Sequence, residues 1–75
     1  MVRELSIRGD VIRLGQLLKL AGVVDAGGDV KGFLATHEVL VNGEAEARRG
    51  RRVRLGDEVR VAGDLLRVVG PGAGS

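Results

Sequence analysis

The hydrophobic pattern of this chain changes its period once, close to Glu38, and this change constrains the fold more than any other feature. Before Glu38, apolar residues recur three and four positions apart, as they do on one face of an amphipathic helix. Two such stripes are present: Leu14, Leu17, Leu18 and Ala21, and then Val30, Phe33 and Leu34. After Glu38, apolar and polar residues alternate, which is typical of half-buried strands. The sequence therefore predicts an α+β fold, in which two short packed helices lie against a small antiparallel β-sheet.

Capping residues indicate where the two helices begin and end. The first helix is predicted over residues 11–22, because Gly22 can adopt the left-handed conformation that ends a helix. The second is predicted to follow Asp25, whose carboxylate can cap its first turn. Three glycines, at 27, 28 and 32, weaken this second helix in isolation. We therefore expect tertiary packing to hold it.

Turn signals divide the rest of the chain into strands. Residues 3–7 alternate as a short first strand. Asn42-Gly43 is the dipeptide most favourable for a tight turn with positive φ, and further turns are predicted at Gly56-Asp57 and Gly63-Asp64. The side chains expected to point into the core are those of Leu14, Leu17, Leu18, Val30, Phe33, Leu34, Val41, Val53, Leu55, Val59 and Val61.

The size of the chain limits its core. It has 75 residues and no cysteine, and Phe33 is its only aromatic residue. A domain this small buries only about 60% of its unfolded surface, and no disulfide supports it. We predict one domain over residues 1–70 and a disordered tail over 71–75. The N-terminus lacks a long apolar stretch, so we expect neither a signal peptide nor a membrane span, and the cytoplasm is the expected location.

Positive charge is concentrated in one short run. Five of the seven residues from Arg48 to Arg54 are arginine, although the formal net charge of the chain is only +2. Such a run can be a solvated face or an edge strand protected against aggregation. It can also bind nucleic acid, because the planar guanidinium group contacts phosphate oxygens bidentately and stacks on bases. Composition alone leaves both interpretations open.

Candidate catalytic groups are scarce. His37 is the only histidine, and there is no cysteine to join it in a metal site or a nucleophilic pair. Gly27-Gly28 fits neither the dinucleotide fingerprint nor the Walker loop, and Asp29 beside it would repel phosphate. We therefore predict a protein that is not an enzyme and that uses no cofactor, metal or small-molecule substrate.

Several motifs occur in a characteristic order. They are R-L-x-x-L-L-K at 13–19, L-K-L-A-G at 18–22, D-A-G-G-D-V-K at 25–31, V-N-G-E-A-E-A-R-R-G-R-R at 41–52 and L-G-D-E-V at 55–59. This series resembles the S4 RNA-binding domain, or alpha-L motif, named after a small-subunit ribosomal protein. Within that family it is most similar to a group of small stand-alone bacterial proteins. The resemblance covers residues 11–62.

The resemblance implies an RNA-binding surface made from the two helices and the strand-loop that follows. The residues predicted to form it are Arg13, Lys19, Lys31, Arg48, Arg49, Arg51, Arg52 and Arg54. The chain departs from the family pattern at Gly15, where an acid is common, and at Ala26-Gly27, where Ser-Arg is common. These departures reduce the expected contribution of the second helix and place more weight on the arginine loop.

The expected partner is structured RNA of the ribosomal or transfer RNA class, in a ribosome-associated role in translation. Duplex RNA presents phosphates and 2′-hydroxyls, which suit arginines, and no exposed aromatic platform is expected for single strands. The alternative is a protein-interaction module whose arginine loop docks on an acidic partner. We expect a monomer.

Overall fold

The computed structural model describes residues 2–71, and this part of the chain forms two helices and seven short strands. In chain order they are β1 (Val2–Ser6), β2 (Val11–Arg13), α1 (Leu14–Leu20), α2 (Val30–Thr36), β3 (Leu40–Val41), β4 (Glu44–Ala45), β5 (Arg52–Arg54), β6 (Glu58–Val61) and β7 (Asp64–Val69). The predicted α+β class is confirmed. The tail prediction at 72–75 lies outside the described residues, and neither described helix is long and apolar enough to cross a membrane.

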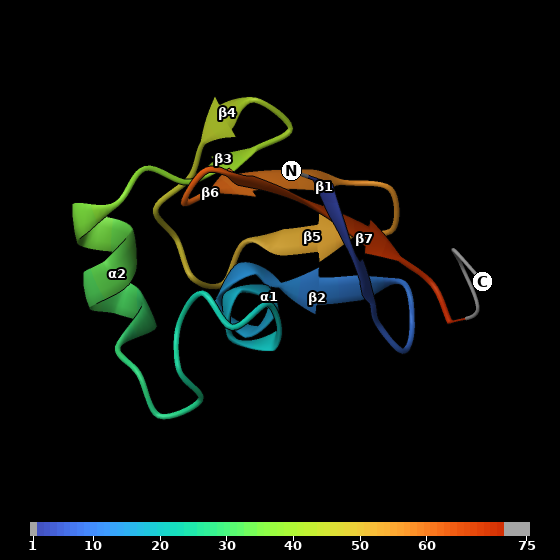
Figure 1. The fold of residues 1–75 in the computed structure, drawn as a ribbon, viewed down its shortest axis with the longest axis horizontal. Helices are drawn as coiled ribbons and strands as arrows, with labels where there is room; N and C mark the ends of the chain where they lie inside the picture. The colour runs from blue at the N-terminus through green and yellow to red at the C-terminus, as the bar shows by residue number, and fades with distance from the viewer. Residues whose placement is uncertain (1, 72–75) are drawn as a thin grey trace.

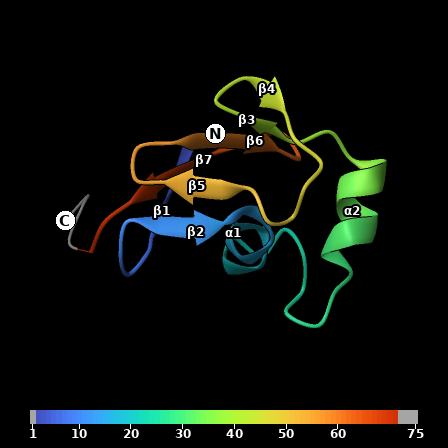
Figure 2. The same cartoon turned by 180° about the vertical axis from the view of Figure 1, so that it is seen from behind.

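The strands form two sheets (Figure 1). One has five strands in the order β1-β7-β6-β3-β4, and the other pairs β2 with β5. Seen from behind, β2 and β5 lie in front of β1 and β7, and α2 lies at one end of the molecule (Figure 2). Most pairs are antiparallel, as predicted, but β1 runs parallel to β7. The long chain between these two strands allows the parallel pairing, which a short turn could not.

The first helix is shorter than its hydrophobic pattern predicted. Residues Val11–Arg13 form β2 instead of a first helical turn, and Ile12 pairs with Val53 of β5. Val11 and Ile12 are β-branched and favour a strand when a partner strand is present. The helix α1 therefore begins only at Leu14. Its predicted end is confirmed, because Gly22 has a φ of 76°.

The second helix begins later than predicted. Asp29, not Asp25, is its N-cap, and its carboxylate accepts a hydrogen bond from the Gly32 N–H at 2.9 Å. The Asp25 carbonyl instead accepts from the Gly28 N–H in the preceding turn. Gly27 therefore lies outside the helix and does not lower the stability of the helix. Gly32 lies inside it, where a Cβ would overlap the Asp29 carboxylate.

One of the three predicted turns is confirmed at its predicted residues, because Asn42 and Gly43 have φ values of 51° and 85°. The other two lie one residue earlier than predicted. One is at Leu55 and Gly56, where the Asp57 N–H donates to the Arg54 carbonyl at 3.0 Å, and the other is at Ala62 and Gly63, because Asp64 already belongs to β7. Asn42 also ties its hairpin to β6, since its side-chain oxygen accepts from the Glu58 N–H at 3.0 Å.

The core lies where the sheets meet α1, and it consists of aliphatic side chains. Its largest fully buried members are Leu14, Leu17, Leu18, Leu66, Val39, Val41, Val53, Val59, Val61 and Val68. Two assignments from the sequence need correction. Leu55 is 44% exposed, because it follows β5 into a turn and reaches only the edge of the core beside Gly70. Phe33 is only partly buried.

The position of Phe33 reduces its importance for stability. Its ring packs on the margin of the core and stacks on His37, with ring centroids 4.2 Å apart. A fully buried phenylalanine loses about 3–5 kcal/mol of stability when it is replaced by alanine. We expect Phe33→Ala to cost less than this, because part of the ring already faces solvent.

Leu17 and Leu20 offer a matched test of this core within one helix. Leu17 is fully buried, whereas Leu20 is 53% exposed. Leu17→Ala should lower the free energy of unfolding by about 2–5 kcal/mol, and Leu20→Ala should change it by about 0.5 kcal/mol or less. Urea denaturation of the two variants measures the difference. Equal losses would contradict the assignment of Leu17 to the core.

Candidate nucleic-acid interface

The loop between β4 and β5, residues 46–51, lies against the first turn of α1. The N–H of Leu14 donates to the Arg51 carbonyl at 2.8 Å, and the N–H of Gly15 donates to the Arg49 carbonyl at 2.9 Å. The first N–H groups of a helix lack partners within the helix, and here no side chain caps them. The backbone of the arginine-rich loop is therefore the cap of α1, which fixes the position of the loop.

Gly15 makes this close approach sterically feasible. It is buried, and a Cβ at this position would lie 3.2 Å from Cγ1 of Val30 and 3.4 Å from Cβ of Arg49. A larger side chain would have to displace either α2 or the loop. The glycine at this position, where an acid is common in the family, therefore has a structural reason in this chain: α1, α2 and the loop approach each other closely here.

Glu46 organises the loop from within. Its side chain is only 8% exposed and accepts hydrogen bonds from the backbone N–H groups of Ala47 and Arg48, each at 3.1 Å. It also accepts from Nε of Arg48 at 3.1 Å and from Nη1 of Arg51 at 2.9 Å. These hydrogen bonds, above all those from the Arg48 and Arg51 side chains, lower the pKa of Glu46 to about 2. The carboxylate is therefore ionised at neutral pH.

The arginines of the loop consequently differ in their surroundings. Arg48 and Arg51 are ion-paired with Glu46, although the Arg48 side chain remains 79% exposed and that of Arg51 31%. Arg49, Arg52 and Arg54 form no ion pair with any other residue between 2 and 71. The sequence analysis treated all five arginines alike, because no sequence pattern indicates which of them are ion-paired with Glu46.

A concave site, called here the basic hollow, lies between α1, the start of α2 and the loop. Its volume is about 360 Å³, and its lining residues are Arg13, Gly15, Gln16, Lys19, Gly28, Asp29, Val30, Arg49 and Gly50. Three of the predicted RNA-binding residues, Arg13, Lys19 and Arg49, therefore meet at one place although they are far apart in sequence. Gln16 and Asp29 were not predicted to belong to the site.

Two further depressions adjoin the basic hollow. Arg48, Gly50, Arg51 and Arg52 line one of them. Arg13, Gln16 and Arg52 line part of the other, beside β2. Because Gly50, Arg13 and Arg52 are shared between neighbouring depressions, the three form one continuous basic surface.

Two predicted residues lie outside these depressions. Lys31 is exposed on α2 and lines none of the three. Arg54 is exposed near the end of β5, two residues beyond Arg52 and on the same face of the strand. The structure thus gathers six of the eight predicted residues and leaves these two at the periphery.

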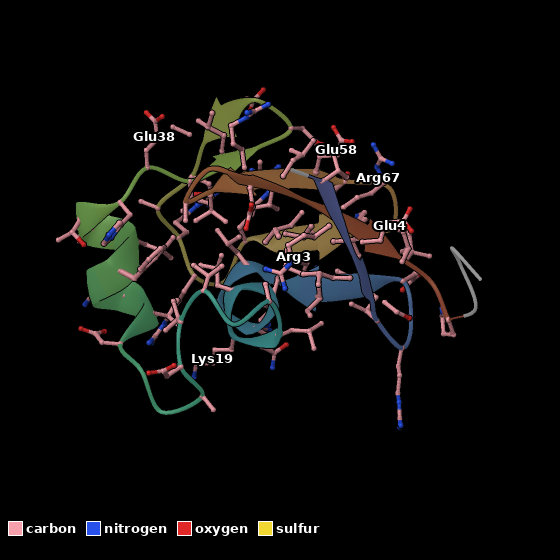
Figure 3. All side chains as sticks on the ribbon, viewed as in Figure 1. Arg3, Glu4, Lys19, Glu38, Glu58 and Arg67 are labelled. Carbon is pink, nitrogen blue, oxygen red and sulfur yellow. The ribbon has the colours of Figure 1, made fainter. Side chains whose placement is uncertain are left out.

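Apart from Glu46 and Asp29, acidic residues form ion pairs on other parts of the fold. Glu58 pairs with Arg67 at 2.7 Å, and Asp64 pairs with Arg3 at 3.9 Å. Figure 3 shows Glu4, Glu58 and Arg67 on the five-stranded sheet, whereas Lys19 lies on α1 at the opposite edge of the molecule. A small net charge is therefore compatible with a local basic surface. The electric field at that surface depends on where the charged residues lie and not on the net charge of the chain.

The Glu46 interactions predict a defined dependence of stability on pH. Because the pKa of Glu46 is lowered from 4.5 to about 2 in the folded protein, its ionised form stabilises the fold above about pH 4.5. This stabilisation is lost as the pH falls from there toward 2. Glu46→Gln should therefore be less stable than wild type at neutral pH, and the difference should shrink across this window.

Urea denaturation at a series of pH values measures this effect. Glu44→Gln is the matched control, since Glu44 is exposed on the neighbouring strand β4, and it should change stability little at any pH. A difference between wild type and Glu46→Gln that stays constant from pH 7 to pH 2 would contradict the role assigned to this carboxylate.

Comparison with known proteins confirms the resemblance seen in the motifs. The S4 domain model matches residues 5–69. The probable ribosome maturation protein RlbA of Bacillus subtilis (strain 168) is 51% identical over 63 residues, which cover 84% of this chain and 89% of that protein. The S4 domain is a non-catalytic family, in agreement with the prediction that the chain is not an enzyme. The chain belongs to the S4 domain family of RNA-binding proteins.

Proposed function

We propose that this protein binds structured ribosomal RNA and acts, without catalysis, in the maturation of the ribosome in the cytoplasm. One observation carries the proposal: residues from α1 and from the arginine loop meet in a single basic surface that the fold holds in place. The relative from Bacillus subtilis is named a probable ribosome maturation protein, which favours ribosomal over transfer RNA. The S4 domain supplies the RNA-binding class.

The side chains on this surface favour structured RNA. Duplex RNA is recognised mainly through phosphates and 2′-hydroxyls across its shallow groove, and arginine matches phosphate geometry. Phe33, the only aromatic residue in the chain, is stacked on His37, so the surface offers no free aromatic ring for a single strand. Shape and charge are therefore the main determinants of recognition.

The ion pairs indicate which arginines are available to bind phosphate and which hold the loop in shape. Arg49 and Arg52 have guanidinium groups without an acidic partner among residues 2–71, so they can bind phosphate without breaking a contact. Arg51 mainly holds the loop in shape through Glu46. Arg48 also bonds Glu46, but its exposed guanidinium group keeps further N–H donors for a phosphate.

This division predicts how the affinity for RNA depends on salt. Each phosphate contact contributes a log–log slope of about −0.7 to −0.9 on the nucleic acids for which it has been calibrated. Arg49→Gln/Arg52→Gln should therefore flatten the slope on a ribosomal RNA fragment by about 1.5 and weaken all structured RNAs similarly. Fluorescence anisotropy titrations at several salt concentrations measure the slope, and thermal melts check the fold.

The matched control is Arg8→Gln/Arg60→Gln, which removes the same charge from two exposed arginines that line none of the three depressions. It should change the slope much less. Equal flattening in both double variants would show that net charge alone matters, and would contradict the proposed surface. Displacement of the RNA by heparin as readily as by unlabelled ribosomal RNA would instead favour docking on an acidic partner.

A further inference from the structure

We infer that duplex RNA extends from the basic hollow along the outer face of β2 and β5, as far as Arg54, and that it does not cross α2. This inference rests on the proposed RNA-binding function and gives the bound RNA a direction. It also separates the two peripheral residues of the predicted set, because it assigns a phosphate contact to Arg54 and none to Lys31.

The pairing of β2 with β5 places four exposed side chains on one face, called here the ribbon face (Figure 2). Its members are Val11 and Arg13 of β2 and Arg52 and Arg54 of β5. Alternate residues of a strand point to opposite faces, and Val53, between the two arginines of β5, is fully buried. The core therefore holds the inner side of the ribbon and leaves its arginine side to solvent.

Like charges face each other across the ribbon. Arg13 lies directly opposite Arg52, and the Cα atoms of such a pair are about 4.5–5.5 Å apart. Neither these two arginines nor Arg54 forms an ion pair with any residue between 2 and 71. Like charges directly opposite each other destabilise a sheet, and protection of an edge strand against aggregation does not require a facing pair. The pair therefore suits an anionic ligand, which would relieve the repulsion on binding.

The ribbon face is continuous with the basic hollow. Arg13 lines both the hollow and the depression of about 290 Å³ beside β2, which Val11 and Arg52 also line. Arg54 is the next residue of β5 on the same face. Residues two apart on a strand are separated by about 6.6 Å, which is similar to the distance between neighbouring phosphates of a nucleic acid strand. Arg52 and Arg54 can therefore contact successive phosphates, and Val11 offers an apolar surface to the ribose between them.

The positions of nearby acids favour this direction over a path across α2. Asp29 lines the hollow at the start of α2, where the Gly32 N–H holds its carboxylate, and this carboxylate repels phosphates that would pass toward Lys31. The ribbon face contains no acid. Asp57, which follows β5, accepts a hydrogen bond from the backbone N–H of Arg54 at 2.9 Å and forms no ion pair with its guanidinium group. That guanidinium group is therefore available for a phosphate.

Arg54→Gln and Lys31→Gln test the direction as a matched pair. Each removes one exposed cation, and neither residue lines the hollow or the two depressions beside it. On an RNA hairpin with a fully paired stem, Arg54→Gln should flatten the log–log salt dependence of binding by about 0.7–0.9, whereas Lys31→Gln should keep the slope of wild type. Arg54→Lys should restore the slope, because lysine also binds phosphate as a point charge. Fluorescence anisotropy measures the slopes, and thermal melts check the fold.

A tethered cleavage probe locates the RNA while every arginine stays in place. The chain has no cysteine, so Val11→Cys and Ala35→Cys each provide a single attachment point for iron–EDTA, whose hydroxyl radicals cleave RNA nearby. Val11 lies on the ribbon face, and Ala35 is exposed on α2, one turn after Lys31. With the hairpin saturated by protein, the probe at residue 11 should cleave the RNA strongly and the probe at residue 35 should not.

The outcomes separate this inference from the proposed function. Equal slopes for Arg54→Gln and Lys31→Gln, while Arg49→Gln/Arg52→Gln flattens the slope, would overturn the path along the ribbon face and leave the proposed function intact. Cleavage from residue 35 and none from residue 11 would place the RNA over α2 and would also overturn the inference. Absence of salt-dependent RNA binding by wild type would overturn the proposed function itself.

Discussion

Two backbone hydrogen bonds, from Leu14 and Gly15 of α1 to carbonyl groups of the arginine loop, are the contacts on which the arrangement of the site depends. A helix needs partners for its first N–H groups, and α1 finds them in a segment more than thirty residues away in the sequence. The same contacts continue the pairing of β2 with β5. Stability and the proposed RNA binding are therefore coupled, because the loop that caps the helix also carries the basic residues. Gly15 is the residue that permits this contact.

Charge on the loop is organised in the same local way. Five donors from residues 47, 48 and 51 hold the Glu46 carboxylate. Its negative charge therefore fixes the loop and partly neutralises the charges of two arginines. The arginine run was visible in the sequence, as was its separation from most acids. The roles of Glu46 in the loop and of Asp29 as the cap of α2 were not visible in the sequence. Each depends on which backbone and side-chain groups the fold brings within hydrogen-bond distance.

The fold was predictable where local chemistry dominates. The helical stripe of α1 and the Asn42-Gly43 turn formed as expected, because periodicity and positive φ are properties of a few neighbouring residues. Prediction failed where a distant partner decides. Val11–Arg13 became β2 because β5 lies beside it, and Leu55 is exposed because the core ends at its turn. The parallel β1–β7 pair likewise brings the two ends of the domain together, which no local pattern indicates.

The central claim is that RNA meets the face formed by α1 and the arginine loop. Crosslinking the protein to ribosomal RNA in cells, followed by mass spectrometry of the crosslinked peptides, tests it most directly. The account predicts crosslinks within residues 46–52 and within α1, at positions that line the basic hollow and its adjoining depressions. Crosslinks confined to the five-stranded sheet, around Glu4, Glu58 and Arg67 (Figure 3), would contradict it.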